Sequence, residues 1–155
     1  MLTNNPISDA RRRNMRAIRA KDTGPELAIR RFLHGLGYRY RLHAADLPGR
    51  PDIVFRGRRK AIEVRGCFWH QHGSKGCRNS VLPKSRGDWW RAKLGATVRR
   101  DQKNLAALEL LGWQVLVIWE CEVAKPETRN RLINFLGALG SSDDSEQHNR
   151  VQRAA

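Results

Sequence analysis

The pattern of hydrophobic and polar positions predicts elements in the order α-α-β-β-β-α-β-α. Tyr38, Tyr40 and Leu42 alternate with polar residues, which is typical of a half-buried strand at 38–43. The run QVLVIW at 114–119 is continuously apolar, as in a strand that is buried on both faces. We expect one α/β sandwich domain over 9–139, with a mixed sheet and polar, disordered ends at 1–8 and 140–155. Its remaining elements are helices at 9–20, 24–36, 89–111 and 127–139 and strands at 52–55 and 60–64.

The helix that follows residue 23 has a recognisable start. Thr23 and Glu26 have the spacing of a capping box, with Pro25 in the first turn, and Gly37 is placed to end the helix. Capping alone is enough to explain Glu26. A carboxylate at a helix start can also reach a water held by a metal, so both roles stay open.

A predicted hairpin places two acids opposite each other. If Gly57-Arg58 forms a two-residue type II′ turn, Ile53 pairs with Ile62, and Asp52 then faces Glu63. Facing like charges destabilise a sheet, and a bridging Mg²⁺ would turn this repulsion into binding. Arg65, two residues beyond Glu63, points to the same face. The alternative is an edge hairpin whose acids are solvated and offset by neighbouring arginines.

A loop rich in sulfur and nitrogen ligands follows the hairpin. Cys67, His72 and Cys77 are close enough in sequence for the loop to fold back on one ion, and Cys121 follows the strand at 114–119. Together they match a structural zinc site with three Cys and one His. The alternative is three buried thiols and a surface histidine.

The charge of the chain narrows the classes of partner. Lys and Arg number 30 against 15 for Asp and Glu, which gives a formal net charge of +15. Such an excess favours a polyanion, most simply a nucleic acid. The charge is spread through patterned elements rather than gathered in one block, which favours a folded nucleic-acid binder over a ribosomal-type or membrane-surface protein. No apolar run approaches the roughly 18 residues of a membrane span.

Several motifs resemble those of the very-short-patch repair (Vsr) endonucleases, over about residues 9–139. Asp52 followed by Glu63-x-Arg65 also resembles the Asp…Glu-x-Lys site of the PD-(D/E)xK nucleases, with Arg in the Lys place. The Vsr-like motifs are NMRAI (14–18), LPGRPD (47–52), GCFWH (66–70), Cys77, Arg100-Asp101 and WEC (119–121).

The resemblance implies a function and its partners. The fold would be that of the type II restriction nucleases. The enzyme would be a Mg²⁺-dependent monomer in the bacterial cytoplasm, acting on the nucleoid and linked functionally to a cytosine-5 DNA methyltransferase. It would nick one strand of duplex DNA beside the T of T:G mismatches, which arise when 5-methylcytosine deaminates.

The resemblance also assigns catalytic residues. Asp52 would bind Mg²⁺ with the backbone carbonyl of Val64, and Glu63 is a further possible ligand. His70 would be the general base or would position the water, and Asp101 would support His70. From the residues alone, Asp101 is more simply an exposed ion-pair partner on a helix. Glu26 would assist through a water held by the metal.

DNA-contacting residues follow from the same resemblance. Phe68, Trp69 and Trp90 would push into the DNA beside the mismatch from the major groove, and Met15 from the minor groove. Trp89, adjacent to Trp90, would then be left to pack. Spacing alone instead favours Phe68 and Trp69 as a core plug beneath the zinc, and packing of Met15 against the residue three positions later.

The chain also departs from the family pattern. That pattern has an apolar residue in place of Glu63 and His or Asp in place of Arg65, so the roles of both residues stay open, and Arg65 is included among the candidate catalytic residues. The interval between His72 and Cys77 is longer by Gly-Ser-Lys-Gly. Two alternatives remain: a related nuclease that cuts matched duplex, as restriction enzymes do, and a non-catalytic zinc protein that binds DNA.

Overall fold

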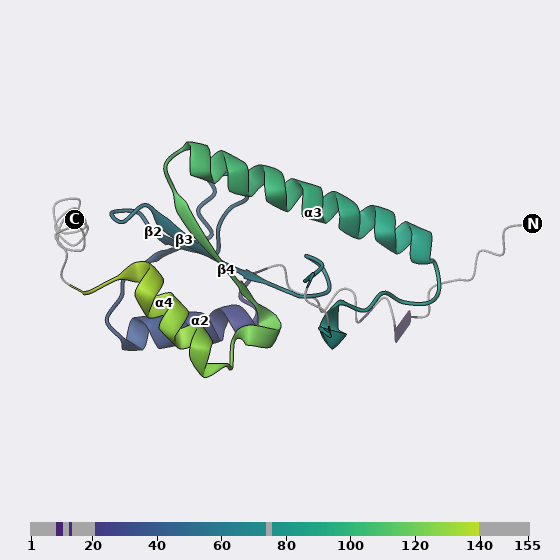
Figure 1. The fold of residues 1–155 in the computed structure, drawn as a ribbon, viewed down its shortest axis with the longest axis horizontal. Coiled ribbons are helices and arrows are strands. Elements are labelled where there is room, and N and C mark those ends of the chain that lie inside the picture. Colours follow the sequence, from purple (N-terminus) through teal and green to yellow (C-terminus); the bar gives the residue numbers. More distant parts are fainter. Residues whose placement is uncertain (1–8, 11–12, 14–20, 74–75, 140–155) are drawn as a thin grey trace, which may run out of the picture.

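The structure, a computed structural model, describes residues 9–10, 13, 21–73 and 76–139. The expectations for the two ends, for Met15 and for most of the helix at 9–20 lie outside the described residues. A four-stranded sheet forms the centre of the described part, with strand order β1-β2-β3-β4 (Figure 1). The strands are β1 (Arg41–Leu42), β2 (Ile53–Phe55), β3 (Lys60–Arg65) and β4 (Gln114–Trp119). β1–β2 and β2–β3 are antiparallel and β3–β4 is parallel, so the expected mixed sheet is confirmed.

The hairpin between β2 and β3 has the predicted register but a different turn. Ile53 pairs with Ile62 and Phe55 with Lys60. The turn is closed by the N–H of Arg59, which donates to the carbonyl of Arg56 at 3.1 Å. The left-handed residue is Arg59, with φ 52°, rather than Gly57. The expected type II′ turn is therefore wrong, because that type needs positive φ at its first central residue.

Helix α2 (Gly24–Gly35) begins largely as its sequence predicts. Thr23 is the N-cap, and its hydroxyl accepts the N–H of Glu26 at 3.4 Å. The Glu26 carboxylate accepts the N–H of Asp22 at 2.9 Å instead of that of Thr23, so only half of the capping box forms. Gly37, with φ 98°, follows the helix end, where a residue without Cβ suits the left-handed conformation.

The other two long helices are α3 (Gly87–Leu110) and α4 (Pro126–Leu136). The N-cap of α3 is Arg86, with φ 57°, and Asp88 lies in the first turn, where it pairs with Arg91. Of two short 3₁₀ turns, η1 (Arg78–Ser80) directly follows Cys77, and η2 (Glu120–Glu122) contains Cys121. Within the described residues, no helix is both long and apolar enough to cross a membrane.

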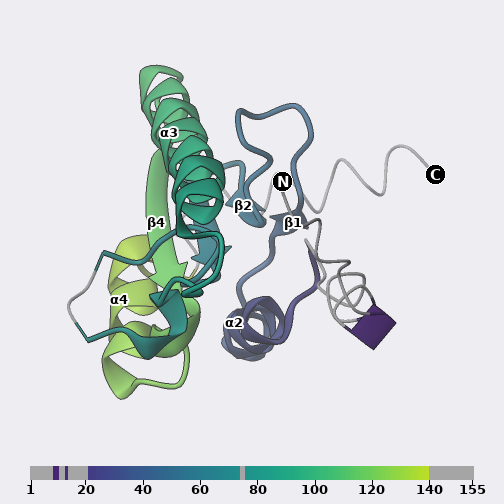
Figure 2. The same cartoon turned by 90° about the vertical axis from the view of Figure 1, so that its right-hand side faces the viewer.

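Two apolar layers sandwich the sheet, with α2 and α4 on one face and α3 on the other (Figures 1 and 2). The larger layer joins both helices to alternate strand residues, among them Ile29, Leu33, Ile53, Ile62 and Leu132. The smaller layer joins the opposite set to α3 and its end: Val54, Ala61, Leu108 and Trp113. Each fully buried aliphatic side chain of this kind contributes roughly 1.5–3 kcal/mol.

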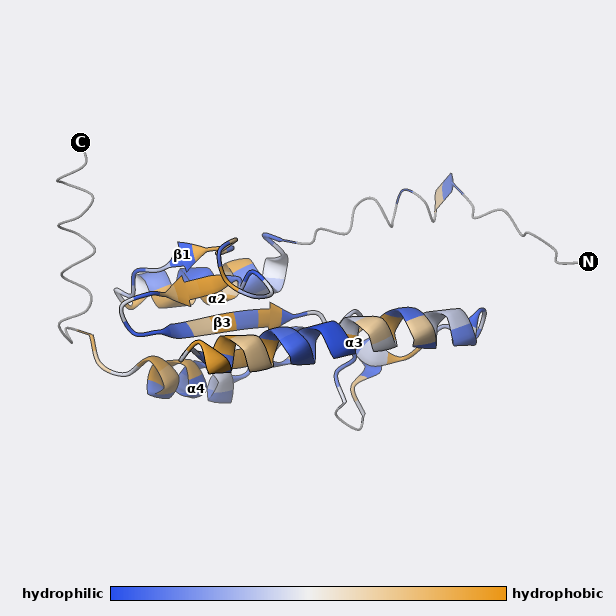
Figure 3. Cartoon of the chain, turned by 90° about the horizontal axis from the view of Figure 1, so that it is seen from above, coloured by the Kyte–Doolittle hydropathy of each residue, from blue (hydrophilic) through white to orange (hydrophobic). Residues whose placement is uncertain are grey.

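The alternation of strand residues decides where the polar residues go. Asp52 is two residues before Val54, and Glu63 and Arg65 are two and four residues after Ala61, so all three face α3. The middle of α3 is hydrophilic on the side seen in Figure 3. Asp101 and Asn104 in the middle of α3 line one cavity with the polar residues of the hairpin. The expected strand at 38–43 is shorter than predicted, because only Arg41 and Leu42 pair with β2.

Candidate active site

A cavity of about 450 Å³ opens between the ends of β2 and β3 and the middle of α3. The sequence motifs lie far apart along the chain, yet six of the predicted site residues line this one cavity. They are Asp52, Glu63, Val64, Arg65, His70 and Asp101.

Asp52 is a largely buried carboxylate at the start of β2. Its Oδ2 accepts the N–H of Val64 at 2.8 Å. Within an extended strand, the N–H and C=O of one residue point to the same side, so the Val64 carbonyl lies on the same side as its N–H. The pKa of the Asp52 carboxyl is raised from 3.8 to about 6, chiefly by burial and also by nearby Glu26 and Glu63, against the lowering effects of the Val64 N–H and of His43. A cation beside Asp52 would relieve this unfavourable burial of charge.

His70 and Asp101 form the second half of the cavity. His70 belongs to the loop after β3, where its N–H donates to the carbonyl of Gly66 at 3.1 Å. Its Nδ1 lies 2.6 Å from Asp101 Oδ2, on α3. A carboxylate that accepts from Nδ1 leaves Nε2 as the ring nitrogen with a free lone pair. Asp101 is thus the partner of His70, not simply an exposed ion-pair partner.

Glu63 and Arg65 form an ion pair inside the cavity. Arg65 donates from Nε and Nη2 to a single oxygen of Glu63, Oε2, at 2.9 and 2.5 Å. Both side chains are 13% exposed. The prediction that they share a face is confirmed. Glu63 is therefore neutralised by Arg65, whereas Asp52 is bonded to a backbone N–H. The two acids of the hairpin thus differ in their counter-charge.

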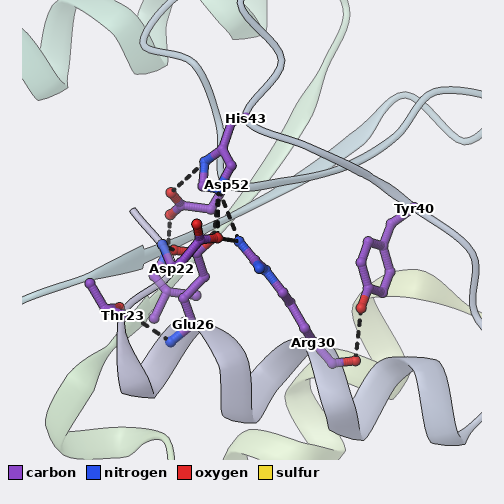
Figure 4. A network of polar contacts seen from close by, with 8 residues as sticks. Asp22, Thr23, Glu26, Arg30, Tyr40, His43 and Asp52 are labelled. Atoms are coloured by element: carbon purple, nitrogen blue, oxygen red, sulfur yellow. Dashed lines mark hydrogen bonds and ion pairs between the residues drawn. The ribbon is translucent and has the colours of Figure 1, made fainter. Parts of the chain in front are cut away.

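Glu26 does not line the cavity but belongs to a polar network beside it (Figure 4). Glu26 is only 2% exposed. The carboxylate contacts Arg30 and lies 3.1 Å from His43 Nε2, whose other nitrogen is 3.9 Å from Asp52 Oδ1. Asp22 completes the network through Arg30, at 2.6 Å.

Sequence reasoning missed Asp22, Arg30 and His43 as members of this network. The strand register could have indicated His43, because this residue directly follows β1. Its N–H donates to the carbonyl of Asp52 at 3.1 Å, which places His43 beside Asp52. Its side chain contacts Arg30 and Glu26 of α2 (Figure 4).

The four predicted sulfur and nitrogen ligands come together. One ligand atom from each of Cys67, His72, Cys77 and Cys121 lies within 4.8 Å of the other three. His72 Nδ1 is 3.6 Å from Cys67 Sγ and 3.4 Å from Cys121 Sγ. The ring of His72 stacks on Trp119 at 4.3 Å between centroids. Burial raises the pKa of the Cys67 thiol to about 12 without a metal. This group could hold a metal ion, which would favour the thiolates.

The aromatic residues of the loop form one cluster with the start of α3. Phe68 contacts Trp69 and Trp90 at centroid distances of 5.1 and 5.3 Å. Trp89 contacts Trp90 at 4.8 Å. Trp90 is 8% exposed and Trp89 is 41% exposed, so the expectation that Trp89 packs is wrong for the DNA-free protein. Trp90 is the buried residue of the two because Phe68 and Trp69, in the loop after β3, pack against it.

Comparisons with known proteins identify relatives of this chain. The family model described as DNA mismatch endonuclease Vsr matches residues 7–76. The chain is 50% identical over 123 residues to the type II nicking enzyme V.XorIIP of Xanthomonas oryzae pv. oryzae, covering 79% of this chain and 88% of that protein. It is 42% identical over 111 residues to the DNA mismatch endonuclease Vsr of Escherichia coli, covering 72% and 69% respectively.

The chain belongs to the Vsr family. A third relative, the type II nicking enzyme V.NmeAIP of Neisseria meningitidis, is 38% identical over 123 residues, with 77% of this chain and 86% of the relative covered. Family membership makes the chain a DNA endonuclease. The small α/β domain with its mixed sheet is consistent with the Vsr nuclease fold.

Proposed function

We propose that this Vsr-family endonuclease nicks one strand of duplex DNA beside the T of T:G mismatches left by deaminated 5-methylcytosine. The observation that carries the proposal is the convergence of Asp52 and the His70–Asp101 pair in one cavity. A mismatch target is in keeping with the resemblance and with the name of the Escherichia coli relative, a DNA mismatch endonuclease. The charge of +15 fits a DNA partner.

The residues around Asp52 fit a divalent cation, and we assign Mg²⁺ to this site. The ligands would be the Asp52 carboxylate and the Val64 carbonyl, both oxygen donors, as Mg²⁺ prefers. The raised pKa of Asp52 supports this assignment, because an uncompensated buried carboxylate is costly. When bound, the ion would polarise the phosphodiester and make a water a better nucleophile.

His70 and Asp101 would supply the proton chemistry. Asp101 holds the ring through Nδ1, so Nε2 would accept the proton of the attacking water. The water oxygen bonds to phosphorus, the bond to the 3′ oxygen breaks, and that oxygen takes a proton. The cut leaves a 5′-phosphate and a 3′-hydroxyl, from which a polymerase can extend. Glu26 would act indirectly, by holding His43 in place beside Asp52.

We assign Arg65 to the scissile phosphate and Glu63 to holding Arg65. A guanidinium in the cavity matches the geometry of phosphate oxygens, and it is the one cation there whose side chain is fixed by two hydrogen bonds that the structure records. Glu63 is weaker as a Mg²⁺ ligand, because its Oε2 is already occupied by Arg65. Glu63 and Arg65, the two residues that depart from the family pattern, would thus act together on the scissile phosphate.

We assign Zn²⁺ to the four-ligand cluster. Tetrahedral zinc with Zn–S of about 2.3 Å and Zn–N of about 2.0–2.1 Å separates sulfur and nitrogen by about 3.5 Å. His72 Nδ1 stands 3.6 and 3.4 Å from two of the sulfurs. The longer interval between His72 and Cys77 thus leaves the ligand spacing suitable. The zinc would be structural, fixing the loop that carries Phe68, Trp69 and His70.

The aromatic cluster would discriminate the mismatch. Phe68 and Trp69 are half-buried, next to the buried Trp90, and a wedge made of them would unstack the DNA beside the target. A T:G pair deforms at lower cost than a matched pair, so the same distortion is easier there. Met15, outside the described residues, keeps its proposed role on the minor-groove side. Because the named relatives include type II nicking enzymes, a cytosine-5 methyltransferase is the proposed functional partner of this monomeric bacterial enzyme.

Strand-specific nicking tests the proposal. End-labelled duplexes are incubated with Mg²⁺ at low salt, one with a T:G mismatch within CT(A/T)GG, one matched and one with other flanks. Cutting of the T strand alone, in the mismatched duplex, is expected. Cutting of matched duplex would replace the proposal with a restriction-like nuclease. Binding to DNA without any cutting would replace it with a non-catalytic zinc protein.

A further inference from the structure

Beside Asp52 lies a group of three potential metal ligands that the proposed Mg²⁺ site does not use. They are Asp22, Glu26 and His43, with one ligand atom from each within 4.8 Å of the other two. His43 Nε2 is 3.1 Å from Glu26 Oε1 and 3.4 Å from Asp22 Oδ1. Neighbouring ligands of an octahedral ion at about 2.1 Å stand about 3.0 Å apart. The spacing therefore suits a cation held among the three side chains.

A guanidinium nitrogen of Arg30 already occupies that position. Arg30 Nη2 is 2.6 Å from Asp22 Oδ1 and 2.9 Å from His43 Nε2, and it also bonds to Glu26 Oε1 (Figure 4). One nitrogen thus contacts all three ligand atoms. The Arg30 side chain is 11% exposed, and arginine stays protonated in proteins. The cluster therefore contains a permanent positive charge.

His43 links this group to Asp52. Its Nε2 is 2.9 Å from Arg30 Nη2, and its Nδ1 lies on the side of Asp52, 3.9 Å from Oδ1. A histidine bound to a metal is placed in a similar way, with one ring nitrogen toward the cation and the other toward a carboxylate or carbonyl.

We propose that Arg30 is a resident cation that stands in the place of a second metal ion next to the Mg²⁺ site. Arg30 is a positioning residue: it holds Glu26 and His43 and offsets the charge of Asp22 and Glu26 while a divalent ion binds at Asp52. The inference rests on the proposed function for that divalent ion. Its consequence is that the group of Asp22, Glu26 and His43 holds no metal ion of its own in the wild type, because a guanidinium supplies the positive charge there.

The test counts bound Mn²⁺, which accepts carboxylate and imidazole ligands, by the decrease of its free paramagnetic resonance signal in zinc-loaded protein. We expect one Mn²⁺ per chain in the wild type and two in Arg30→Met. Arg30→Lys, which keeps a cation, is the matched control and is expected to bind one. His43→Ala in the Arg30→Met background should return the count to one.

Thermal unfolding keeps the test decisive if Arg30→Met folds poorly, because the buried Glu26 then lacks its counter-charge. We expect Mn²⁺ to raise the Tm of Arg30→Met by a larger amount than that of the wild type. The inference would be overturned if Arg30→Met bound one Mn²⁺ and showed no larger rise in Tm than the wild type. It would also be overturned if the wild type bound two Mn²⁺ and the His43→Ala variant bound only one. Asp52→Ala tests the proposed Mg²⁺ site separately: it should remove the wild-type Mn²⁺, and its failure to do so would count against that site while leaving the comparison at Arg30 intact.

Discussion

His70 Nδ1 and Asp101 Oδ2 lie 2.6 Å apart, although 31 residues separate them in the sequence. The loop after β3 carries the imidazole and the middle of α3 carries the carboxylate, so the pair forms only when the helix crosses the sheet in the observed way. This hydrogen bond orients Nε2 and stabilises the imidazolium that a general base becomes.

The pair predicts a graded loss of activity. His70→Ala should lower the single-turnover nicking rate by about 10²–10⁴. Asp101→Asn should lower it by a smaller factor, because the asymmetric amide holds the ring less well in the required tautomer. Glu109→Gln, an exposed acid on the same helix, should leave the rate unchanged. An Asp101→Asn enzyme as fast as the wild type would contradict the role given to this bond.

Asp52 predicts how stability depends on pH in Mg²⁺-free buffer. Its folded pKa of about 6 lies above 3.8, so the native state favours the protonated acid. The stabilisation that this provides is fully present below pH 4 and is lost as the pH rises through 6, by up to about 3 kcal/mol. Asp52→Asn should therefore be more stable than the wild type at pH 7.5 by about 1–3 kcal/mol, with a much smaller difference at pH 4.

Urea unfolding at the two pH values measures this difference. Mg²⁺ should stabilise the wild type and leave Asp52→Asn unaffected, because only the carboxylate attracts the ion. A variant that is less stable than the wild type at pH 7.5 would show that burial of this charge is not the dominant effect.

The sulfur and nitrogen cluster predicts one zinc per chain. Cys121→Ser should lose that metal and lower the Tm by about 10 °C or more, because a structural zinc contributes several kcal/mol to folding. His34→Gln, at an exposed histidine on α2, should keep both metal and Tm. Metal content by mass spectrometry and thermal unfolding are the measurements. A Cys121→Ser protein that keeps its zinc would remove Cys121 from the ligand set.

Glu63 and Arg65 predict different effects on rate and on metal affinity. Arg65→Met should lower the single-turnover rate by about 10²–10³, as when a group that stabilises developing charge is removed. Glu63→Gln should lower the rate by about tenfold, because Arg65 then loses its hold, and should leave the Mg²⁺ concentration for half-maximal rate within about twofold. Arg56→Met is the control, since Arg56 pairs with Asp46 on the surface. A large rise in the Mg²⁺ requirement of Glu63→Gln would instead make Glu63 a metal ligand.

The sequence predicts the centre of this site better than its surroundings. The hairpin length and the alternation around Ile53 and Ile62 determine the register, so the convergence of Asp52, Glu63 and Arg65 could be deduced. The turn conformation was not deducible from Gly57 alone, because Arg59 also tolerates positive φ at a modest cost.

The residues that were missed depend on contacts between distant elements. Arg30 meets Asp22 and His43 because α2 packs against the sheet next to the end of β1, and no local pattern encodes that approach. Trp89 and Trp90 face about 100° apart on α3, and only the position of Phe68 decides which is buried. Helix propensity and alternation carry no information about such a choice.

The most direct measurement is single-turnover nicking of the T:G duplex by the wild type and by Asp52→Asn, with the DNA affinity of each determined in parallel. We expect an affinity within about threefold of the wild type and a rate lower by about 10³ or more, since Asn keeps the hydrogen bond with Val64 but not the charge that binds Mg²⁺. An Asp52→Asn enzyme that cuts at the wild-type rate would place the chemistry outside this cavity and exclude Asp52 as the catalytic metal ligand.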